Sequence, residues 1–177
     1  MVESPTDKLR NAVRDVPDFP QPGILFKDIT PVLADAWLLQ LAIDGMAACF
    51  HGQRIDKVVG IDARGFIFGA MLAQRLHTGF IPARKKGKLP WQTIGVDYSL
   101  EYGTNSIELH KDAILPGENV ILADDLLATG GTAGAVLDLI KQSGGNLLGS
   151  VFFIELAFLN GREKIGHHGP VHSLLTY

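Results

Sequence analysis

The sequence predicts an α/β fold in which a central, mostly parallel sheet is flanked by helices. Short apolar runs typical of buried strands alternate along the chain with segments whose apolar residues recur every three or four positions, as on one face of a helix. Strands that alternate with helices pair in parallel through right-handed crossovers. The chain has 177 residues and contains no internal repeat and no linker long enough to divide it. We therefore expect a single domain over residues 1–177.

The first third of the chain predicts two helices and one strand. Residues 8–16 are expected to form a short amphipathic helix, and residues 18–23 a loop, because two prolines and a glycine interrupt any regular element there. Apolar side chains recur at helical spacing over residues 37–50, which predicts a longer helix. Residues 57–61 are almost wholly apolar and are typical of a buried strand.

The middle of the chain continues the alternation. A helix is predicted over residues 64–76 and a strand over residues 79–84. Residues 93–99 and 106–109 fit either the two arms of a hairpin or a flexible loop, and the pattern leaves both possibilities open.

The last third predicts three strands and a helix. The strongest strand covers residues 119–123, and a helix with one apolar face follows it and ends at residues 143–145. Further strands are expected over residues 147–156 and 171–175. In parallel sheets, ligands bind where the strands end, so the residues that follow each strand are the candidates for function.

Composition excludes several classes of protein. The chain has 16 basic and 19 acidic residues, and this balance argues against a broad nucleic-acid-binding surface. The single cysteine, Cys49, cannot form a disulfide within the chain. The longest apolar run, residues 151–159, is interrupted by Glu155 and is far shorter than the ~20 residues that span a bilayer. We expect a cytoplasmic protein that binds neither nucleic acid nor a membrane.

The strand over residues 119–123 leads into a segment suited to phosphate. Gly130 and Gly131 let backbone N–H groups approach an anion without a side chain between them. Thr129 and Thr132 add hydroxyl donors, and the following helix start carries about half a positive charge. An ordinary helix cap would need one of these residues and not the whole run.

Two carboxylates, Asp124 and Asp125, come just before the phosphate-binding segment. Carboxylates accept hydrogen bonds from the diol of a ribose and can help to hold Mg²⁺ through water. A phosphate site beside acceptors for a diol describes a ribose 5-phosphate. Other phosphate motifs fail here, because no G-x-G-x-x-G follows a strand and Phe66 and Ile67 stand where a P-loop requires Lys and Ser or Thr.

Basic and aromatic residues mark two more candidate positions. Arg64 follows the strand over residues 57–61, where its guanidinium could meet an anion. Phe26 lies just past the proline-rich loop, where an aromatic ring can stack on a base. The ordinary alternatives are a surface charge for Arg64 and a core position for Phe26. Four of the 16 basic residues fall within five positions and suggest a further anion site or a solvated turn: Arg84, Lys85, Lys86 and Lys88.

These runs resemble a known family. Residues 120–125 followed by 128–132 resemble the phosphoribosyl-pyrophosphate signature of the type I phosphoribosyltransferases. Four further runs, which extend the likeness in order over nearly the whole chain, are similar to the adenine phosphoribosyltransferases of that family: residues 19–29, 60–66, 84–90 and 98–103. The resemblance implies the type I phosphoribosyltransferase fold, with a small base-binding hood over residues 1–34 and a flexible catalytic loop.

The resemblance also implies a reaction and a set of site residues. Adenine and phosphoribosyl pyrophosphate would react to give AMP and pyrophosphate in a homodimer, with Mg²⁺ held mainly by the substrate and through water by Asp124 and Asp125. It assigns the phosphoribose to Asp124, Asp125, Ala128, Thr129, Gly130, Gly131 and Thr132. It assigns pyrophosphate to Arg64, Arg84 and Lys88, and adenine to Phe26, Lys27 and Leu156. It assigns catalysis to Glu101, which would share a proton with the base, and to Tyr102.

Other functions remain as alternatives. The chain could be a phosphoribosyltransferase for another purine, or a regulator that senses phosphoribosyl pyrophosphate without turning it over. A regulator would show a degraded catalytic loop or an added nucleic-acid-binding domain, whereas this loop carries Glu101. The missing dinucleotide fingerprint argues against an oxidoreductase. Two departures from the family pattern leave the contacts to pyrophosphate and base open: Ala63 stands where some relatives have Ser, and Lys27 where Arg is common.

Overall fold

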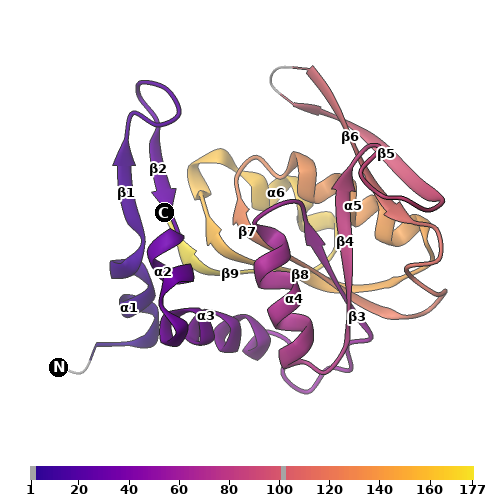
Figure 1. Cartoon of the computed structure of the whole chain (residues 1–177), viewed down its shortest axis with the longest axis horizontal. Helices are drawn as coiled ribbons and strands as arrows, with labels where there is room; N and C mark the ends of the chain where they lie inside the picture. The colour runs from indigo at the N-terminus through magenta and orange to yellow at the C-terminus, as the bar shows by residue number, and fades with distance from the viewer. Residues whose placement is uncertain (1–2, 101–102) are drawn as a thin grey trace.

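The structure is a computed structural model that describes residues 3–100 and 103–177. A seven-stranded sheet forms its centre (Figure 1). In spatial order, its strands are β5 (Thr93–Leu100), β6 (Gly103–His110), β4 (Gly79–Lys85), β3 (Lys57–Ile61), β7 (Asn119–Leu127), β8 (Asn146–Glu155) and β9 (Val171–Thr176). The five strands from β4 to β9 in this order pair in parallel, and the antiparallel β5–β6 hairpin joins the β4 edge. The predicted fold class is confirmed.

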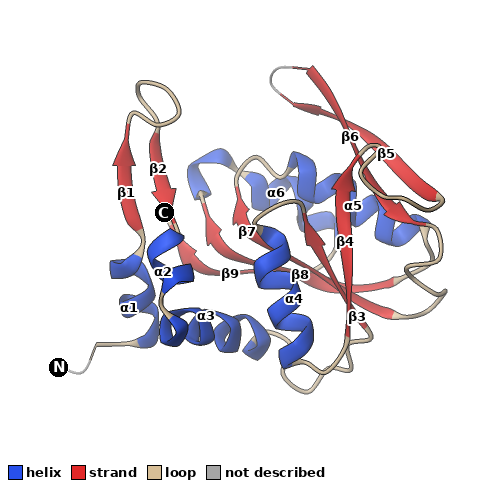
Figure 2. Cartoon of the chain, in the orientation of Figure 1, coloured by secondary structure: helices blue, strands red, loops and turns tan. Residues whose placement is uncertain are grey.

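Helices cover both faces of the sheet (Figure 2). One face is covered by α1 (Pro5–Ala12), α2 (Thr30–Ala34), α3 (Ala36–Ala48) and α4 (Gly65–Arg75). The other is covered by α5 (Gly131–Gln142) and α6 (Gly161–Ile165), with the short 3₁₀ helices η1 (Ala157–Leu159) and η2 (Gly166–His168) beside them. Successive residues of one strand face opposite cores, since Val58 packs under α4 and Val59 under α5. Burial on both faces explains why these strands are continuously apolar.

The element predictions hold for most of the sheet. The strand over residues 57–61 and the helix over residues 37–50 are confirmed, the latter ending at Ala48. Of the two possibilities for residues 93–109, the structure has the hairpin, with Tyr98 opposite Asn105. Within the described ranges, no helix has both the length and the apolar character needed to cross a bilayer.

The prediction of a helix over residues 8–16 is wrong at both ends. Ser4 caps α1, its side chain accepting a hydrogen bond from the Asp7 N–H at 3.1 Å, and the helix stops at Ala12. The next residues form β1 (Arg14–Pro17), which pairs antiparallel with β2 (Leu25–Asp28). Cross-strand contacts drive this pairing, among them the ion pair between Lys27 and Asp15 at 2.6 Å.

β7 extends four residues beyond its predicted end at Ala123. The extension pairs with β8, which places Asp124 opposite Phe152 and Leu127 opposite Glu155. Asp124 and Asp125 therefore lie within the strand, whereas the sequence predicted them beyond its end. A strand alternates its side chains, so the two carboxylates leave the backbone in different directions.

Two hairpins rise beyond the ends of the parallel strands. Figure 1 shows β1–β2 on one side of the carboxyl ends and β5–β6 on the other. The β1–β2 turn is closed by Asp18, whose side chain accepts a hydrogen bond from the Gly23 N–H at 2.8 Å, and Gly23 has a φ of 88°. Phe19 and Phe26 pack edge to face across the hairpin, with ring centres 5.1 Å apart. Both hairpins therefore stand near the connections that follow the parallel strands (Figure 1).

Candidate functional site

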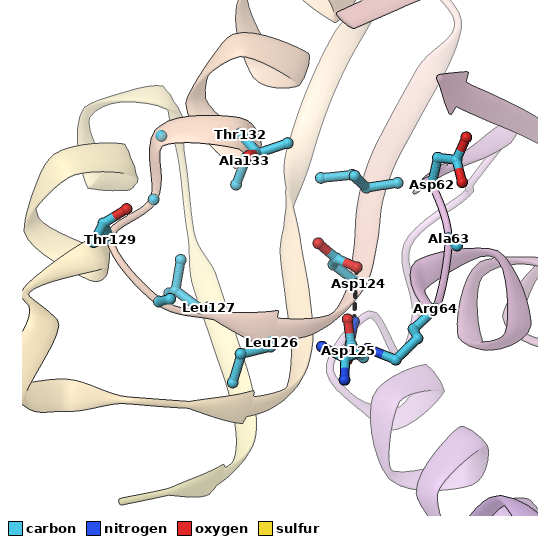
Figure 3. A pocket seen from close by; sticks show the side chains of 14 residues that line it. Asp62, Ala63, Arg64, Asp124, Asp125, Leu126, Leu127, Thr129, Thr132 and Ala133 are labelled. Atoms are coloured by element: carbon cyan, nitrogen blue, oxygen red, sulfur yellow. Dashed lines mark hydrogen bonds and ion pairs between the residues drawn. The ribbon is translucent and has the colours of Figure 1, made fainter. Parts of the chain in front are cut away.

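A cavity of about 350 Å³ lies at the carboxyl ends of β3 and β7 (Figure 3). These strands are parallel neighbours, with Gly60 opposite Ala123, so the connections that follow them meet at one edge of the sheet. Residues 61–64 form one wall of the cavity and residues 124–133 the other. The structure thus gathers Arg64 and all seven predicted phosphoribose residues around a single cavity.

The far wall of the cavity is the start of α5, a candidate site for an anion. Gly130 precedes α5 with a φ of 76°, a left-handed conformation that favours glycine. A β-carbon at Gly130 would also lie 2.8 Å from the Gly161 carbonyl oxygen, and one at Gly161 would collide with the Ala128 carbonyl. The first N–H groups of a helix have no intrahelical acceptor and attract negative charge. The backbone here is therefore shaped to accept a phosphate.

The two carboxylates lie at the other end of the same wall. Asp125 is 6% exposed, and its backbone N–H donates a hydrogen bond to the Asp124 carboxylate at 2.9 Å. Gly65, the first residue of α4, makes room for Asp124, because a β-carbon there would overlap the Asp124 carboxylate oxygen. The carboxylate pair thus depends on a glycine from the neighbouring connection.

Burial makes this pair electrostatically unfavourable. Loss of solvent and then repulsion from Asp125 hold the pKa of Asp124 well above its usual value. Burial also raises the pKa of Asp125, although the charge of Arg64 opposes that rise. Two carboxylates in these surroundings gain from any ligand that brings a cation or hydroxyl donors.

Arg64 connects the carboxylates to the β1–β2 hairpin. Its Nε lies 2.7 Å from a carboxylate oxygen of Asp125. Its guanidinium carbon lies 5.6 Å from the centre of the Phe26 ring, within the range of a cation–π contact. Part of the Arg64 side chain remains exposed at the cavity. The predicted anion-binding residue therefore contacts both the carboxylate pair and the aromatic ring of the β1–β2 hairpin.

Arg84 supports a wall of the cavity, whereas Lys88 does not line the cavity. Arg84 donates hydrogen bonds to the Asp62 carboxylate and to the Lys88 carbonyl, each at 3.0 Å. Asp62 lines the cavity, so Arg84 braces its wall. The Lys88 side chain is exposed and is not among the groups that line the cavity. Asp62 is a site residue that the sequence analysis missed, although it stands in the run over residues 60–66 that carries the resemblance.

The three predicted adenine residues occupy different surroundings. Phe26 faces Arg64, as described above. The Lys27 side chain lies on the opposite face of β2, where its ammonium group binds Asp15 and lies 4.0 Å from the ring centre of Tyr177. Only the backbone of Lys27 is therefore available to contact a base. Leu156 follows β8, and its N–H donates to the Leu127 carbonyl at the end of β7.

The predicted catalytic residues, Glu101 and Tyr102, lie outside the described residues. The strands on either side of them are β5 and β6. Across the ranges that the structure covers, no group of three His, Cys, Asp or Glu side chains is placed to hold a metal ion.

Comparison with known proteins decides the family. Residues 35–167 match the phosphoribosyl transferase domain. The chain belongs to the phosphoribosyltransferase family. Among similar members of the family, an adenine phosphoribosyltransferase of Anaeromyxobacter dehalogenans is 54% identical over 171 residues, which cover 97% of this chain and 99% of the relative. One from Myxococcus xanthus is also 54% identical and covers 96% of this chain, with 91% of its own length matched.

Solved phosphoribosyltransferases have the same fold. The adenine phosphoribosyltransferase of Rhodothermus marinus superposes with a TM-score of 0.93 at 54% identity over 98% of each chain. The Saccharomyces cerevisiae enzyme, solved with an imino-altritol bisphosphate and adenine, gives 0.91 at 42% identity over 98% of this chain and 99% of its own. The Giardia lamblia enzyme, solved with 9-deazaadenine, gives 0.92 at 34% identity over 99% of both chains. The predicted type I phosphoribosyltransferase fold is confirmed.

Proposed function

We propose that this phosphoribosyltransferase transfers the 5-phosphoribosyl group from phosphoribosyl pyrophosphate to adenine, giving AMP and pyrophosphate in purine salvage. The observation that carries the proposal is the cavity in which a phosphate-binding helix start and a buried carboxylate pair lie on one wall. The relatives support the choice of base, because two of the solved enzymes hold adenine or 9-deazaadenine.

The 5-phosphate end of the substrate binds the segment from Ala128 to Thr132. Backbone N–H groups of Gly130 and Gly131 approach the phosphate, and the hydroxyls of Thr129 and Thr132 add donors. Asp124 and Asp125 accept hydrogen bonds from the ribose diol. Because the phosphate binds at one end of this wall and the diol at the other, the sugar is oriented with its C1′ toward the hairpins.

Mg²⁺ fits the charge of this cavity. Burial and the neighbouring Asp125 raise the pKa of Asp124, and Arg64 is the counter-charge beside Asp125, so a divalent cation would suit this carboxylate pair. Mg²⁺ that arrives with the substrate would be held through water by Asp124 and Asp125, and it would neutralise the charge that grows on the departing pyrophosphate.

Pyrophosphate binds on the side of the β3–α4 connection. Arg64 exchanges its contact with Asp125 for the anion, and its exposed side chain has room to do so. Arg84 holds the connection in place through Asp62. Lys88, exposed beyond β4, approaches the anion of its own or of a partner subunit's site.

Adenine lies between the hood and the end of β8. Phe26 stacks on one face of the base, which contributes ~1–3 kcal/mol. Leu156 closes the other face, and the backbone of Lys27 reads the edge of the base. We call the space between Phe26 and Leu156 the base slot. The hood, residues 1–34, supplies one of its two walls.

Glu101 acts on the base during transfer. Adenine N9 forms the bond to C1′ while the bond from C1′ to the pyrophosphate oxygen breaks, and the N9 proton passes to water or to the departing pyrophosphate. Glu101 shares a proton with N7 during this change, and Tyr102 shapes the loop that excludes water.

Replacing Glu101 with Gln tests this role. Glu101→Gln lowers kcat by about 10²-fold, because a general acid contributes roughly 10²–10⁴, and it leaves binding of phosphoribosyl pyrophosphate intact. Steady-state kinetics and titration of phosphoribosyl pyrophosphate measure the two effects. Glu163→Gln, an exposed change on α6, is the matched control. An unchanged kcat removes Glu101 from the mechanism.

Family likeness also supports a cytoplasmic homodimer. Light scattering of the purified chain measures the assembly state, and fractionation of cells measures location. A monomer that remains fully active would remove the dimer from the proposal.

One comparison of bases tests the function as a whole. The chain is mixed with Mg²⁺, phosphoribosyl pyrophosphate and adenine, guanine or hypoxanthine in turn, and the nucleotide product is separated by chromatography. AMP as the main product is expected. Turnover of another purine alone would assign the chain to a sister enzyme. Binding of phosphoribosyl pyrophosphate with no product from any base would favour the sensor.

A further inference from the structure

We propose that Tyr177 is a positioning residue for adenine, because it links the two walls of the base slot. The inference rests on the proposed function, which places adenine between Phe26 and Leu156. Nothing in the motifs of the family-like runs includes Tyr177, which stands in the sequence far from both walls. Figure 1 shows this end of the chain beside β2.

The ring of Tyr177 contacts the hood. The Lys27 ammonium lies 4.0 Å from its centre, and the Arg10 guanidinium carbon lies 5.0 Å from it. Lys27 directly follows Phe26 in β2 and is tied to the partner strand by Asp15. A shift of Lys27 relative to the ring would therefore move Phe26 as well. The ring holds both α1 and the hairpin that carries the Phe26 wall.

The backbone of Tyr177 holds the other wall. Its N–H donates to the Glu155 carbonyl, and its carbonyl accepts from the Ala157 N–H, both at 2.9 Å. Glu155 and Ala157 are the residues on either side of Leu156. One residue thus fixes the segment that carries Leu156 and, through its ring, the strand that carries Phe26.

The Leu156 side of this link is itself rigid. The Glu155 carboxylate binds the Arg162 guanidinium and accepts a hydrogen bond from the Ser173 hydroxyl at 2.5 Å. Arg162 also donates to the Val171 carbonyl at 2.5 Å, which joins α6 to β9. The hood meets this segment through Lys27 and Arg10 at the Tyr177 ring and through the hydrogen bond from Arg10 to the Thr176 carbonyl at 3.0 Å, so the ring helps to set the distance between the two walls.

The phosphoribose cavity does not depend on this link. Its walls are the β3–α4 and β7–α5 connections, and Tyr177 is not among their lining residues. Loosening the hood should therefore weaken adenine binding and leave the binding of phosphoribosyl pyrophosphate unchanged. A general loss of stability would instead lower the amount of active enzyme for both substrates.

Kinetics of three variants test the proposal in the full chain. Tyr177→Ala raises the KM for adenine about five- to tenfold, the scale of one or two cation–π contacts, with kcat and the KM for phosphoribosyl pyrophosphate within about twofold of the native values. Tyr177→Phe keeps the ring and retains the native KM. Trp37→Ala is the matched control, because it removes another cation–π pair to α1, with Lys8 at 4.8 Å, away from the base slot.

Three results would overturn the proposal: an unchanged KM for adenine in Tyr177→Ala, an equal rise of both KM values, or the same rise in Trp37→Ala. If Tyr177→Ala does not fold, Tyr177→Leu keeps the packed volume without an aromatic face and decides the question. If the native chain turns over another purine, the proposed base is wrong, and the same KM comparison with that purine still tests Tyr177.

Discussion

The pKa values of two aspartates at opposite ends of the sheet shift in opposite directions. Asp56 stands just before β3, at the amino ends of the parallel strands, and Asp124 stands near the carboxyl end of β7. Asp56 accepts hydrogen bonds from the Asn119 N–H at 2.8 Å and from Arg54 at 3.0 Å, and these bonds hold its pKa below the usual value. Burial and Asp125 move the pKa of Asp124 the other way.

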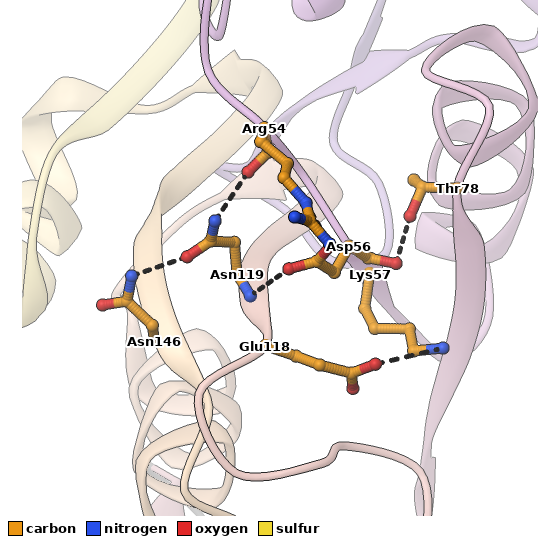
Figure 4. A network of polar contacts seen from close by, with 7 residues as sticks. All are labelled: Arg54, Asp56, Lys57, Thr78, Glu118, Asn119 and Asn146. Carbon is orange, nitrogen blue, oxygen red and sulfur yellow. Dashed lines mark hydrogen bonds and ion pairs between the residues drawn. The ribbon is translucent and has the colours of Figure 1, made fainter.

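At the amino end, polar groups are satisfied by one another (Figure 4). The Asn119 amide donates to the Arg54 carbonyl at 2.9 Å and accepts from the Asn146 amide at 2.7 Å. Lys57 lies 3.6 Å from Glu118. These contacts join the starts of β3, β7 and β8, which are neighbours in the sheet. Charge at this end stabilises the fold.

At the carboxyl end, two buried carboxylates lower the stability of the fold. Asp124 and Asp125 are held close together in a cavity, with Arg64 as a shared counter-charge. Such an arrangement is unfavourable until a ligand supplies hydroxyl donors or a cation, and sites of this kind are commonly built at some expense of stability. The comparison teaches that the pKa of an aspartate at an end of this sheet rises where burial and a second carboxylate act on it and falls where hydrogen-bond donors surround it. Five substitutions test it.

Gly65→Ala should have the largest effect. The new β-carbon overlaps the Asp124 carboxylate, so the carboxylate must leave its position on the ribose side. Losing one or two hydrogen bonds to a charged group, at ~1.5–3 kcal/mol each, lowers kcat/KM for phosphoribosyl pyrophosphate about 100-fold or more. Steady-state kinetics measure this. Gly166→Ala, which meets nothing within 4 Å, is the control. Native kinetics in Gly65→Ala would contradict the assigned position of Asp124.

Asp125→Asn should have a smaller effect on the same substrate. The change removes the charge that holds Arg64 and weakens the acceptor for the diol. We expect the KM for phosphoribosyl pyrophosphate to rise about tenfold, on the scale of a single charge-assisted hydrogen bond. Titration with varied Mg²⁺ shows whether the metal dependence weakens too. Asp112→Asn, an exposed change in the turn after β6, should alter neither value. Unaltered kinetics in Asp125→Asn would count against its role.

Asp124→Asn should make the unliganded protein more stable at neutral pH. Because the pKa of Asp124 is raised by folding, the native state binds its proton more tightly than the unfolded chain does, and stability falls as pH rises toward and through the folded pKa. Asn cannot ionise, so the variant does not lose this stability. The difference in Tm between Asp124→Asn and the native chain is therefore greatest above the folded pKa of Asp124, and it shrinks as pH falls toward the ordinary value of 3.8.

The opposite dependence is expected at the other end of the sheet. The lowered pKa of Asp56 gives stability that is present above its ordinary value and lost as pH falls. Asp56→Asn is therefore less stable than the native chain at neutral pH, and the deficit disappears in acid. Thermal melting of both variants over a range of pH measures this. A lower Tm for Asp124→Asn at neutral pH would reverse the comparison.

Asn119→Ala should have the smallest effect on function. It removes two side-chain hydrogen bonds at the amino end, each with a net contribution of ~1 kcal/mol, so the free energy of unfolding falls by about 1–2 kcal/mol. Urea denaturation measures that loss, while kcat and both KM values stay native. A change in either KM would show that the two ends of the sheet are not independent.

Local pattern predicted the sheet and the cavity wall because both depend on short segments. The apolar run over residues 57–61 and the glycine-rich run ending at Thr132 carry their structure in neighbouring residues. The β1–β2 hairpin was missed because contacts between separate segments, such as Lys27 with Asp15, decide it. The extension of β7 was missed because pairing with β8 decides where it ends.

The same distinction applies to the site residues. The carboxylates come directly after the apolar run over residues 119–123, and Arg64 comes three residues after the run over residues 57–61, so local pattern predicted them. Asp62 is held by Arg84, and Tyr177 contacts three segments that are distant in the chain. No local spacing encodes such contacts, which arise only when the elements pack together.

The contact between the glycines at the starts of α5 and α6 limits how far the segment over residues 124–133 can be transferred to another protein. Gly130 and Gly161 meet backbone to backbone, so the bend before α5 takes its form partly from α6. If residues 124–133 alone were grafted onto another scaffold, the hydrogen-bond donors would be transferred without the backbone of Gly161, which fixes the shape of the bend. A successful graft would need to bring an equally bare stretch of backbone with it.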